Sequence, residues 1–149
     1  DNMPFKRIKY KLLRAIKNKQ MCIVGIYDNS MFSGTDKLSM AVQPDFINFV
    51  NKCDSKTILF EGDRLFNQSL FDKLMCDIVV IQADKEVVHN RHIERKDTQT
   101  EKFIKAKRTK ISNIIANNKV KVFSNNNMQE QQIIVEHINN LINEQNRTQ

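Results

Sequence analysis

The chain has 149 residues, among them 24 Lys/Arg and 17 Asp/Glu, which gives a net charge of +7. This length suits one domain whose core needs no disulfide or metal support. No apolar run reaches the roughly 18 residues of a membrane-spanning helix. The basic residues 6–19 are not followed by the apolar run and cleavage site of a signal peptide. We therefore expect a single cytoplasmic domain over residues 1–149 that does not enter a membrane.

The positive charge favours an anionic partner, such as a nucleotide, a nucleic acid or an acidic surface. The three cysteines, Cys22, Cys53 and Cys76, are odd in number and far apart, without a CxxC pair. Structural zinc requires clustered ligands, so this spacing predicts free thiols in a reducing compartment.

Four short apolar runs have the length of strands, and five segments have the periodicity or composition of helices. The predicted strands are residues 21–27, 57–61, 77–83 and 119–123. The predicted helices are residues 5–19, 44–53, 67–75, 85–117 and 129–143.

The first predicted helix, residues 5–19, carries seven Lys/Arg and no acid. Phe5, Ile8, Leu12 and Ile16 recur at helical spacing and predict its apolar face. The basic residues predict either a solvated face or a surface that attracts nucleic acid phosphates.

Helices and strands alternate along the chain, and this order predicts an α/β fold with one parallel sheet and helices on both faces. Ligands of such sheets bind beyond the carboxyl ends of the strands. Polar residues gather at these ends. They are Asp28-Asn29-Ser30, Gly62-Asp63-Arg64, Asp84-Lys85 and Ser124.

The turn after the second predicted strand reads Glu61-Gly62-Asp63-Arg64-Leu65-Phe66. Asp63 can hold magnesium through water or accept a proton from a hydroxyl, and Arg64 can bind a phosphate with two hydrogen bonds. Gly62 allows the chain to turn so that both side chains reach one site. The alternative is a turn whose Asp and Arg make only local surface contacts.

Asp63-Arg64 at the end of a strand, followed by Ser69 and a helix, resembles the motif of the thymidylate kinases. The sequence departs from that motif in having Leu65 at the usual aromatic position and Phe66 one place later. The resemblance implies a P-loop kinase-like three-layer sandwich, with ATP and Mg²⁺ as cofactors.

Residues 85–110 contain nine Lys/Arg and four acids. The resemblance places the mobile lid of nucleotide kinases here. It implies that Arg91, Arg95 and Arg108 close on the transferring phosphoryl group. The alternative is a solvated helix with salt bridges along its face.

The loop after the first predicted strand contains Gly34-Thr35-Asp36-Lys37-Leu38-Ser39. This run, the Gly62-Asp63-Arg64 turn and the stretch from His92 to Gln99 are together similar to the bacteriophage kinases that phosphorylate 5-hydroxymethyluracil in DNA. That similarity implies an acceptor pocket formed by Asp28, Asp36, Lys37 and Ser39, in the host cytoplasm. The alternative is an ordinary connecting loop.

The sequence contains no GxxxxGK[ST] phosphate-binding loop, and its three glycines are Gly25, Gly34 and Gly62. In the kinase family this loop precedes the first helix, and the sequence begins at Asp1, not Met. We therefore expect one strand and one loop to precede the residues given. The alternative is a divergent relative without catalysis.

The leading hypothesis is ATP-dependent phosphoryl transfer to a nucleotide or to a modified base in DNA. Its catalytic residues are Asp63, Arg64, Arg95 and Arg108, and Asp63 is its magnesium ligand. The alternative is a non-catalytic module that binds nucleic acid or protein on a kinase-like scaffold, because a fold does not fix a function.

Overall fold

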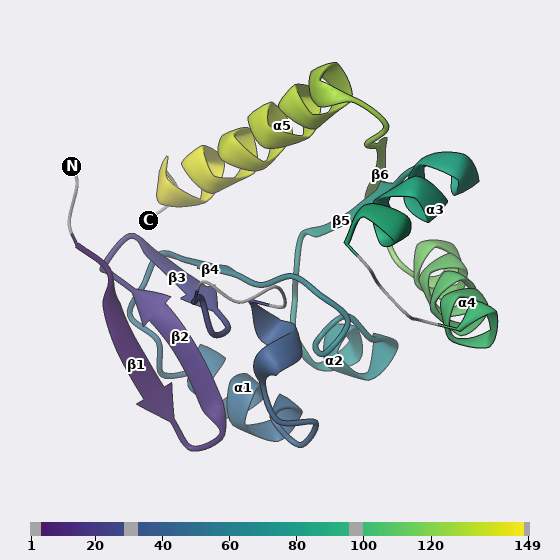
Figure 1. Ribbon diagram of the computed structural model, residues 1–149. Coiled ribbons are helices and arrows are strands. Elements are labelled where there is room, and N and C mark those ends of the chain that lie inside the picture. Colours follow the sequence, from purple (N-terminus) through teal and green to yellow (C-terminus); the bar gives the residue numbers. More distant parts are fainter. Residues whose placement is uncertain (1–3, 29–32, 96–99, 148–149) are drawn as a thin grey trace. The chain divides into compact units, whose positions relative to one another are not determined.

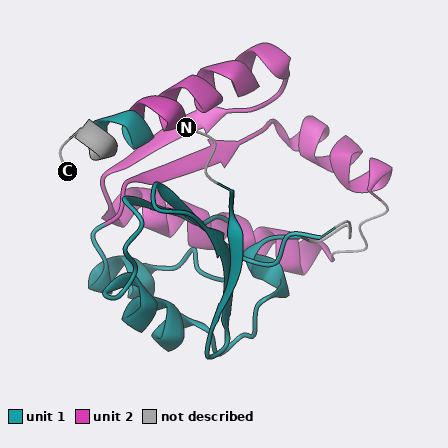
Figure 2. Cartoon of the chain, turned by 90° about the vertical axis from the view of Figure 1, so that its left-hand side faces the viewer, with its two compact units in different colours: residues 1–75, 141–149 teal, residues 76–140 magenta. Residues whose placement is uncertain are grey.

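A computed structural model describes residues 4–28, 33–95 and 100–147, and the chain divides into two compact units (Figures 1 and 2). The first unit combines residues 1–75 with residues 141–149, and the second contains residues 76–140. The single domain expected from the sequence stays a prediction.

The first unit contains a four-stranded sheet in the order β1-β2-β3-β4 (Figure 1). Its strands are β1 (Lys6–Tyr10), β2 (Leu13–Lys17), β3 (Met21–Val24) and β4 (Thr57–Leu59). β1, β2 and β3 pair antiparallel in sequence order, whereas β3 and β4 pair parallel. The chain between β3 and β4 contains the short helix η1 (Thr35–Lys37) and the helix α1 (Gln43–Val50).

The core of the first unit is formed by residues of the sheet, α1 and the segment that leads into α2 (Gln68–Lys73). Pro44 lies in the first turn of α1, where its missing N–H costs no hydrogen bond. Phe46 of α1 is fully buried and packs edge-on against Phe60, with ring centroids 4.9 Å apart. The other large, fully buried apolar side chains of this unit are Leu13, Val24, Val42, Leu65 and Leu70.

The helix predicted for residues 5–19 is wrong, because these residues form the β1–β2 hairpin. The tight turn places Lys11 at a φ of 52°, a left-handed conformation that ends any helix. Leu13 is fully buried and Ala15 nearly so, whereas Leu12 is 45% exposed. The burial therefore has the period of two of a strand, and the spacing of Ile8, Leu12 and Ile16 was misleading.

The second unit contains a parallel pair of strands, β5 (Ile78–Gln82) and β6 (Val120–Ser124). The long charged segment between them forms two helices, α3 (Lys85–Glu94) and α4 (Glu101–Asn117). Thr100 caps α4 by accepting a hydrogen bond from the backbone N–H of Phe103 at 3.2 Å. After β6 comes α5 (Met128–Arg147), whose last residues belong to the first unit.

The predicted fold class, one parallel sheet with helices on both faces, is wrong. The described residues form a four-stranded mixed sheet, mostly antiparallel, and a separate two-stranded parallel sheet. The β1–β2 hairpin explains why the four-stranded sheet is mostly antiparallel, because two strands joined by a tight turn must pair antiparallel. The prediction also placed β4 and β5 in one sheet, whereas they belong to separate sheets. Both are short apolar runs, and their sequences do not specify which strand each one pairs with.

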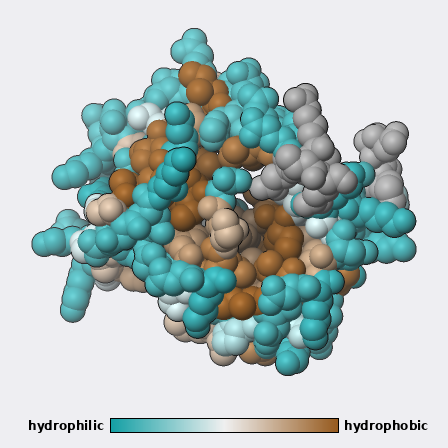
Figure 3. All heavy atoms as spheres, turned by 180° about the vertical axis from the view of Figure 1, so that it is seen from behind, coloured by the Kyte–Doolittle hydropathy of each residue, from teal (hydrophilic) through white to brown (hydrophobic). Residues whose placement is uncertain are grey.

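Hydrophilic side chains surround groups of hydrophobic ones on the face shown in Figure 3. Several large apolar side chains are exposed, among them Met75, Ile93 and Phe103. No helix within the described residues has both the length and the apolar character that crossing a membrane requires.

Candidate functional site

Two of the segments that the sequence indicated lie together at one edge of the sheet. β3 and β4 are parallel, with Met21 paired to Thr57 and Ile23 to Leu59. Their carboxyl ends therefore lie at the same edge, where ligands of parallel strands bind. The loop of residues 34–37 and the turn of residues 61–64 meet there.

The backbone joins the first of these segments to the end of β3. Ile26 and Gly34 exchange two hydrogen bonds, from Ile26 N–H to the Gly34 oxygen at 3.0 Å and from Gly34 N–H to the Ile26 oxygen at 2.7 Å. This bridge fixes where η1 begins. Gly34 adopts a φ of 107°, and a Cβ there would lie 2.5 Å from Oε1 of Glu61. The Glu61 side chain therefore lies over the backbone of Gly34.

A buried hydroxyl joins η1 to the turn after β4. Thr35 is fully buried, and its Oγ1 donates a hydrogen bond to the backbone oxygen of Glu61. Gly62 follows with a φ of 95°, and a Cβ there would lie 2.6 Å from Oγ1 of Thr35. Only glycine combines that φ with so close an approach. The predicted role of Gly62, to let the side chains of Asp63 and Arg64 reach one site, stays a prediction.

Arg64 adds a second connection between the two segments. Its Nη2 donates a hydrogen bond to the backbone oxygen of Asp36 at 3.0 Å. Its Nε is buried and has no hydrogen-bond partner among the described residues. A buried N–H without a partner is costly, so the hydrogen-bonding capacity of this group is unused within the described part of the chain. We call Gly34, Thr35, Asp36, Glu61 and Arg64 the edge site.

The acidic groups of the edge site influence one another. Partial burial, and then the negative charge of Asp36, raises the pKa of the Glu61 carboxyl above its usual range. The pKa of the nearby Tyr27 hydroxyl is also raised, first by burial and then by the charge of Glu61. That hydroxyl donates to the backbone oxygen of Val24 at 2.9 Å. Glu61 is therefore a better proton acceptor than an ordinary glutamate.

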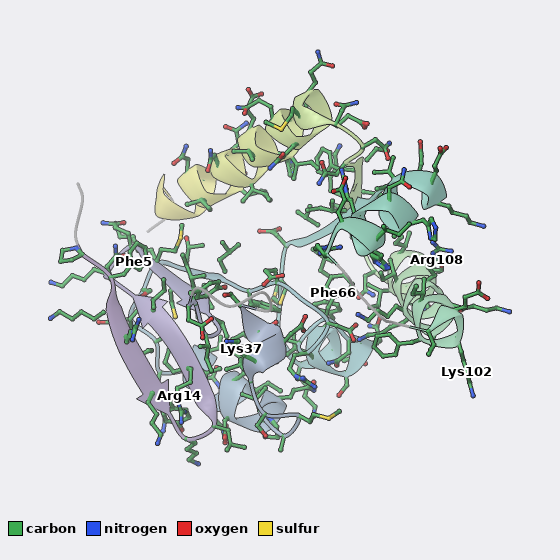
Figure 4. The ribbon with its side chains drawn as sticks, in the orientation of Figure 1. Phe5, Arg14, Lys37, Phe66, Lys102 and Arg108 are labelled. Carbon is green, nitrogen blue, oxygen red and sulfur yellow. The ribbon has the colours of Figure 1, made fainter. Side chains whose placement is uncertain are left out.

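The remaining candidates of the first unit lie around the edge site. Nζ of Lys37 forms an ion pair with Oδ2 of Asp28 at 2.5 Å (Figure 4 labels Lys37). Ser39 is exposed and accepts a hydrogen bond from the backbone N–H of Ala41 at 3.2 Å, in the turn before α1. Asp63 is exposed in the turn between Gly62 and Arg64. Lys37 is therefore engaged with Asp28, and Arg64 is the cation of the edge site.

The three arginines assigned to a lid belong to the second unit. Arg91 lies in α3, and Arg95 is its C-cap, with its Nε donating to the Arg91 backbone oxygen at 3.4 Å. Arg108 is exposed on α4 (Figure 4). Asp97 and Gln99 of the predicted lid motif lie outside the described residues. The structure brings Asp36 and Arg64 together, and the role of these three arginines stays a prediction.

The ATP and magnesium sites that the resemblance implies stay predictions. The described residues include no group of three or more His, Cys, Asp or Glu side chains that could hold a metal ion. Gly34 belongs to the edge site, and Gly62 lies against Thr35 of that site. Gly25 has a φ of 130°, and a Cβ there would lie 2.4 Å from the carbonyl carbon of Gly34. The backbone N–H groups of Gly25 and Gly34 donate to the backbone oxygens of Arg14 and Ile26, so neither is free for a phosphate.

The cysteines are free, as the sequence predicts. Cys22 is fully buried in β3, and its burial, together with the neighbouring Cys53 thiol, raises its pKa to about 12. A thiol with this pKa stays protonated at neutral pH and is a poor nucleophile.

No family model, curated protein or solved structure matches this chain. The sequence reasoning identified both segments of the edge site but gave Glu61 no role, because the approach of its side chain to Gly34 and to the charge of Asp36 arises only in the fold. Gly34 and Gly62 were the available signal, since each precedes a cluster of polar residues.

Proposed function

We propose that the edge site binds the hydroxyl-bearing acceptor of an ATP-dependent phosphoryl transfer in the cytoplasm. The acceptor is a nucleotide or a modified base in DNA. The observation that carries the proposal is the buried Nε of Arg64, which has no partner among the described residues and belongs to the site where the carboxyl ends of β3 and β4 meet.

The two kinds of group in the edge site suit different atoms of such an acceptor. Arg64 donates hydrogen bonds and carries a fixed positive charge, so it favours a phosphate or a base carbonyl oxygen. Glu61 has a raised pKa and can take the proton of a hydroxyl that is about to form a bond to phosphorus. Asp63, the base expected from the sequence, is exposed beside it and is the second candidate for this role.

ATP supplies the phosphoryl group in this proposal, and Arg91, Arg95 and Arg108 are its proposed contacts. Because the described residues contain no phosphate loop and no cluster for magnesium, we derive no step that passes through either group. The proposal is therefore specific about the acceptor, and its first test is acceptor binding.

The test measures binding and transfer separately. Binding of thymidine monophosphate, and of a DNA strand with and without 5-hydroxymethyluracil, is measured by calorimetry with wild-type protein and with an Arg64→Met variant. Transfer of label from γ-labelled ATP to each acceptor is measured with Mg²⁺ present. We expect Arg64→Met to abolish binding, and Glu61→Gln to keep binding but lose transfer.

Three outcomes separate the alternatives. Acceptor binding without any transfer would support the non-catalytic module. Binding that is equally strong in the Arg64→Met variant would show that the edge site is not where the acceptor binds. Transfer that survives Glu61→Gln but not Asp63→Asn would assign the base to Asp63.

A further inference from the structure

The β1–β2 hairpin presents positive charge on the face opposite the core. Leu13 and Ala15 of β2 are buried, so the side chains that alternate with them point to the other face. Arg7 and Lys9 of β1 lie on this opposite face and are exposed. Arg14 of β2 shares the face, because it pairs directly with Lys9 (Figure 4 labels Arg14). We call Arg7, Lys9 and Arg14 the hairpin cations.

The register of the hairpin places like charges opposite each other twice, and the fold compensates only one of these pairs with an acid. Lys6 is paired with Lys17, whose Nζ forms an ion pair with Asp54. Lys9 is paired with Arg14, and no ion pair to either is found among the described residues. Like charges directly opposite each other destabilise a hairpin, so an anion lying over Lys9 and Arg14 would relieve their repulsion.

The surroundings of the turn add further positive charge. Lys11 and Lys52 both lie over the ring of Tyr10, with Nζ 5.7 Å and 5.2 Å from its centroid. Because Tyr10 pairs with Leu13 on the core face, these two charges do not belong to the face of the hairpin cations. The carboxylate of Asp45 accepts a hydrogen bond from the Leu12 backbone N–H at this turn, at 3.0 Å. Nη1 of Arg14 donates to the backbone oxygens of Lys11 and Leu13, which steadies the guanidinium beside the turn.

A two-stranded ribbon with cations on one exposed face matches the phosphate backbone of nucleic acid. The major groove of B-DNA admits a two-stranded β-ribbon, and Lys and Arg contacts to phosphates supply most of the affinity of sequence-independent binding. We propose that the β1–β2 hairpin binds the phosphate backbone of double-stranded DNA without base specificity. The proposal does not depend on phosphoryl transfer, because this binding requires neither ATP nor the edge site.

The simpler explanation is that lysines on β1 only protect an edge strand from pairing with another chain. That explanation predicts no special role of these residues in binding DNA. A comparison of two double variants with equal loss of charge distinguishes the explanations. They are Arg7→Gln/Lys9→Gln in the hairpin and Lys102→Gln/Lys105→Gln on the exposed face of α4 (Figure 4 labels Lys102).

Binding of a short fluorescein-labelled DNA duplex is followed by fluorescence anisotropy between about 50 and 200 mM salt. We expect the hairpin variant to bind about tenfold more weakly at the low salt and to lower the slope of log K against log salt by about 2. The α4 variant should change both quantities much less. A conservative Arg7→Lys/Lys9→Arg variant should bind as the wild type does, and circular dichroism checks that all three fold.

Three results would overturn the proposal. One is an equal loss of affinity in the hairpin and α4 variants, which would mean that net charge alone attracts DNA. Another is an equal loss of affinity for polyglutamate in the hairpin variant, which would mean that the hairpin attracts any polyanion. Absence of duplex binding by the wild type at the low salt would also exclude it.

Discussion

The guanidinium of Arg64 donates a hydrogen bond from Nη2 to the backbone oxygen of Asp36 at 3.0 Å, while its Nε is buried without a partner among the described residues. The same side chain therefore contributes one satisfied and one unsatisfied donor to the edge site. A satisfied hydrogen bond adds about 1 kcal/mol to stability, whereas a buried donor without a partner costs about 1–3 kcal/mol. On this balance the Arg64 side chain adds little net stability to the fold through its hydrogen bonds.

The first prediction is that Arg64→Met leaves the fold about as stable as the wild type. Methionine keeps much of the side-chain volume but removes both Nη2, which bonds to the Asp36 oxygen, and the buried Nε. The stability lost with the first donor and the cost relieved with the second should nearly cancel, so the free energy of unfolding changes by about 1 kcal/mol or less. Urea unfolding measures this change. Arg108→Met on α4 is the control, because Arg108 is exposed. A loss of several kcal/mol at Arg64 alone would show that its role is structural.

The second prediction concerns the contact between Gly62 and Thr35. Gly62→Ala should destabilise the protein by about 2–3 kcal/mol, from a left-handed φ and from collision of the new Cβ with Oγ1 of Thr35. Thermal or urea unfolding measures the loss. Thr35→Ala alone should cost about 1–2 kcal/mol, because it removes the buried hydrogen bond to the Glu61 oxygen.

The double variant Gly62→Ala/Thr35→Ala is the internal control for this contact. Alanine at residue 35 has no Oγ1, so the collision disappears, and only the backbone strain and the lost hydrogen bond remain. The two losses should therefore sum to more than the loss of the double variant. Strict additivity would contradict the close approach of these two residues.

The third prediction follows from the raised pKa of Glu61. A folded protein that binds this proton more tightly than the unfolded chain loses stability as the pH rises from about 4, the unfolded pKa, through the higher folded pKa. Glu61→Gln removes this titration, so the variant should be more stable than the wild type at pH 7. The difference should disappear below about pH 4.

Urea unfolding at a series of pH values tests this prediction. Asp36→Asn provides a second variant, because the charge of Asp36 is one cause of the raised pKa of Glu61. It should shift the pH dependence in the same direction but by less, since burial is the larger cause. A Glu61→Gln variant that is less stable at pH 7 would mean that its carboxylate makes favourable contacts that outweigh the cost of its burial.

Local patterns in the sequence identified most elements but not their pairing. β3, β4, β5 and β6 were found because each is a short apolar run, and α1 because Pro44 begins it. Which strands share a sheet depends on contacts far apart in the sequence, such as Cys22 with Ile58. Composition does not encode such pairings, so the fold class was predicted wrongly.

The edge site shows the same limit at the level of single residues. Asp63 and Arg64 were predicted because they follow a buried strand, and Asp36 and Lys37 because they cluster after a glycine. The bond from Thr35 to the Glu61 backbone oxygen joins residues 26 apart, and the Glu61 side chain lies against Gly34, so neither contact has a local signal in the sequence. The nearest clue in the sequence was the glycine before each polar cluster. Gly34 and Gly62 both have a positive φ, which favours glycine.

The last prediction tests directly whether residues 5–19 form a hairpin. Lys11 has a φ of 52°, where a Cβ costs about 1–2 kcal/mol and glycine costs nothing comparable. Lys11→Gly should therefore be more stable than Lys11→Ala by about 1 kcal/mol after the greater freedom of glycine in the unfolded chain is counted.

The comparison with alanine serves as the control, because both variants lose the charge and the contact of Lys11 with the Tyr10 ring. The expected order reverses if these residues are helical, since glycine inside a helix is about 1 kcal/mol less favourable than alanine. Urea unfolding of the two variants thus gives opposite signs for the two structures. A more stable alanine variant would remove the hairpin, and with it the surface proposed to bind DNA.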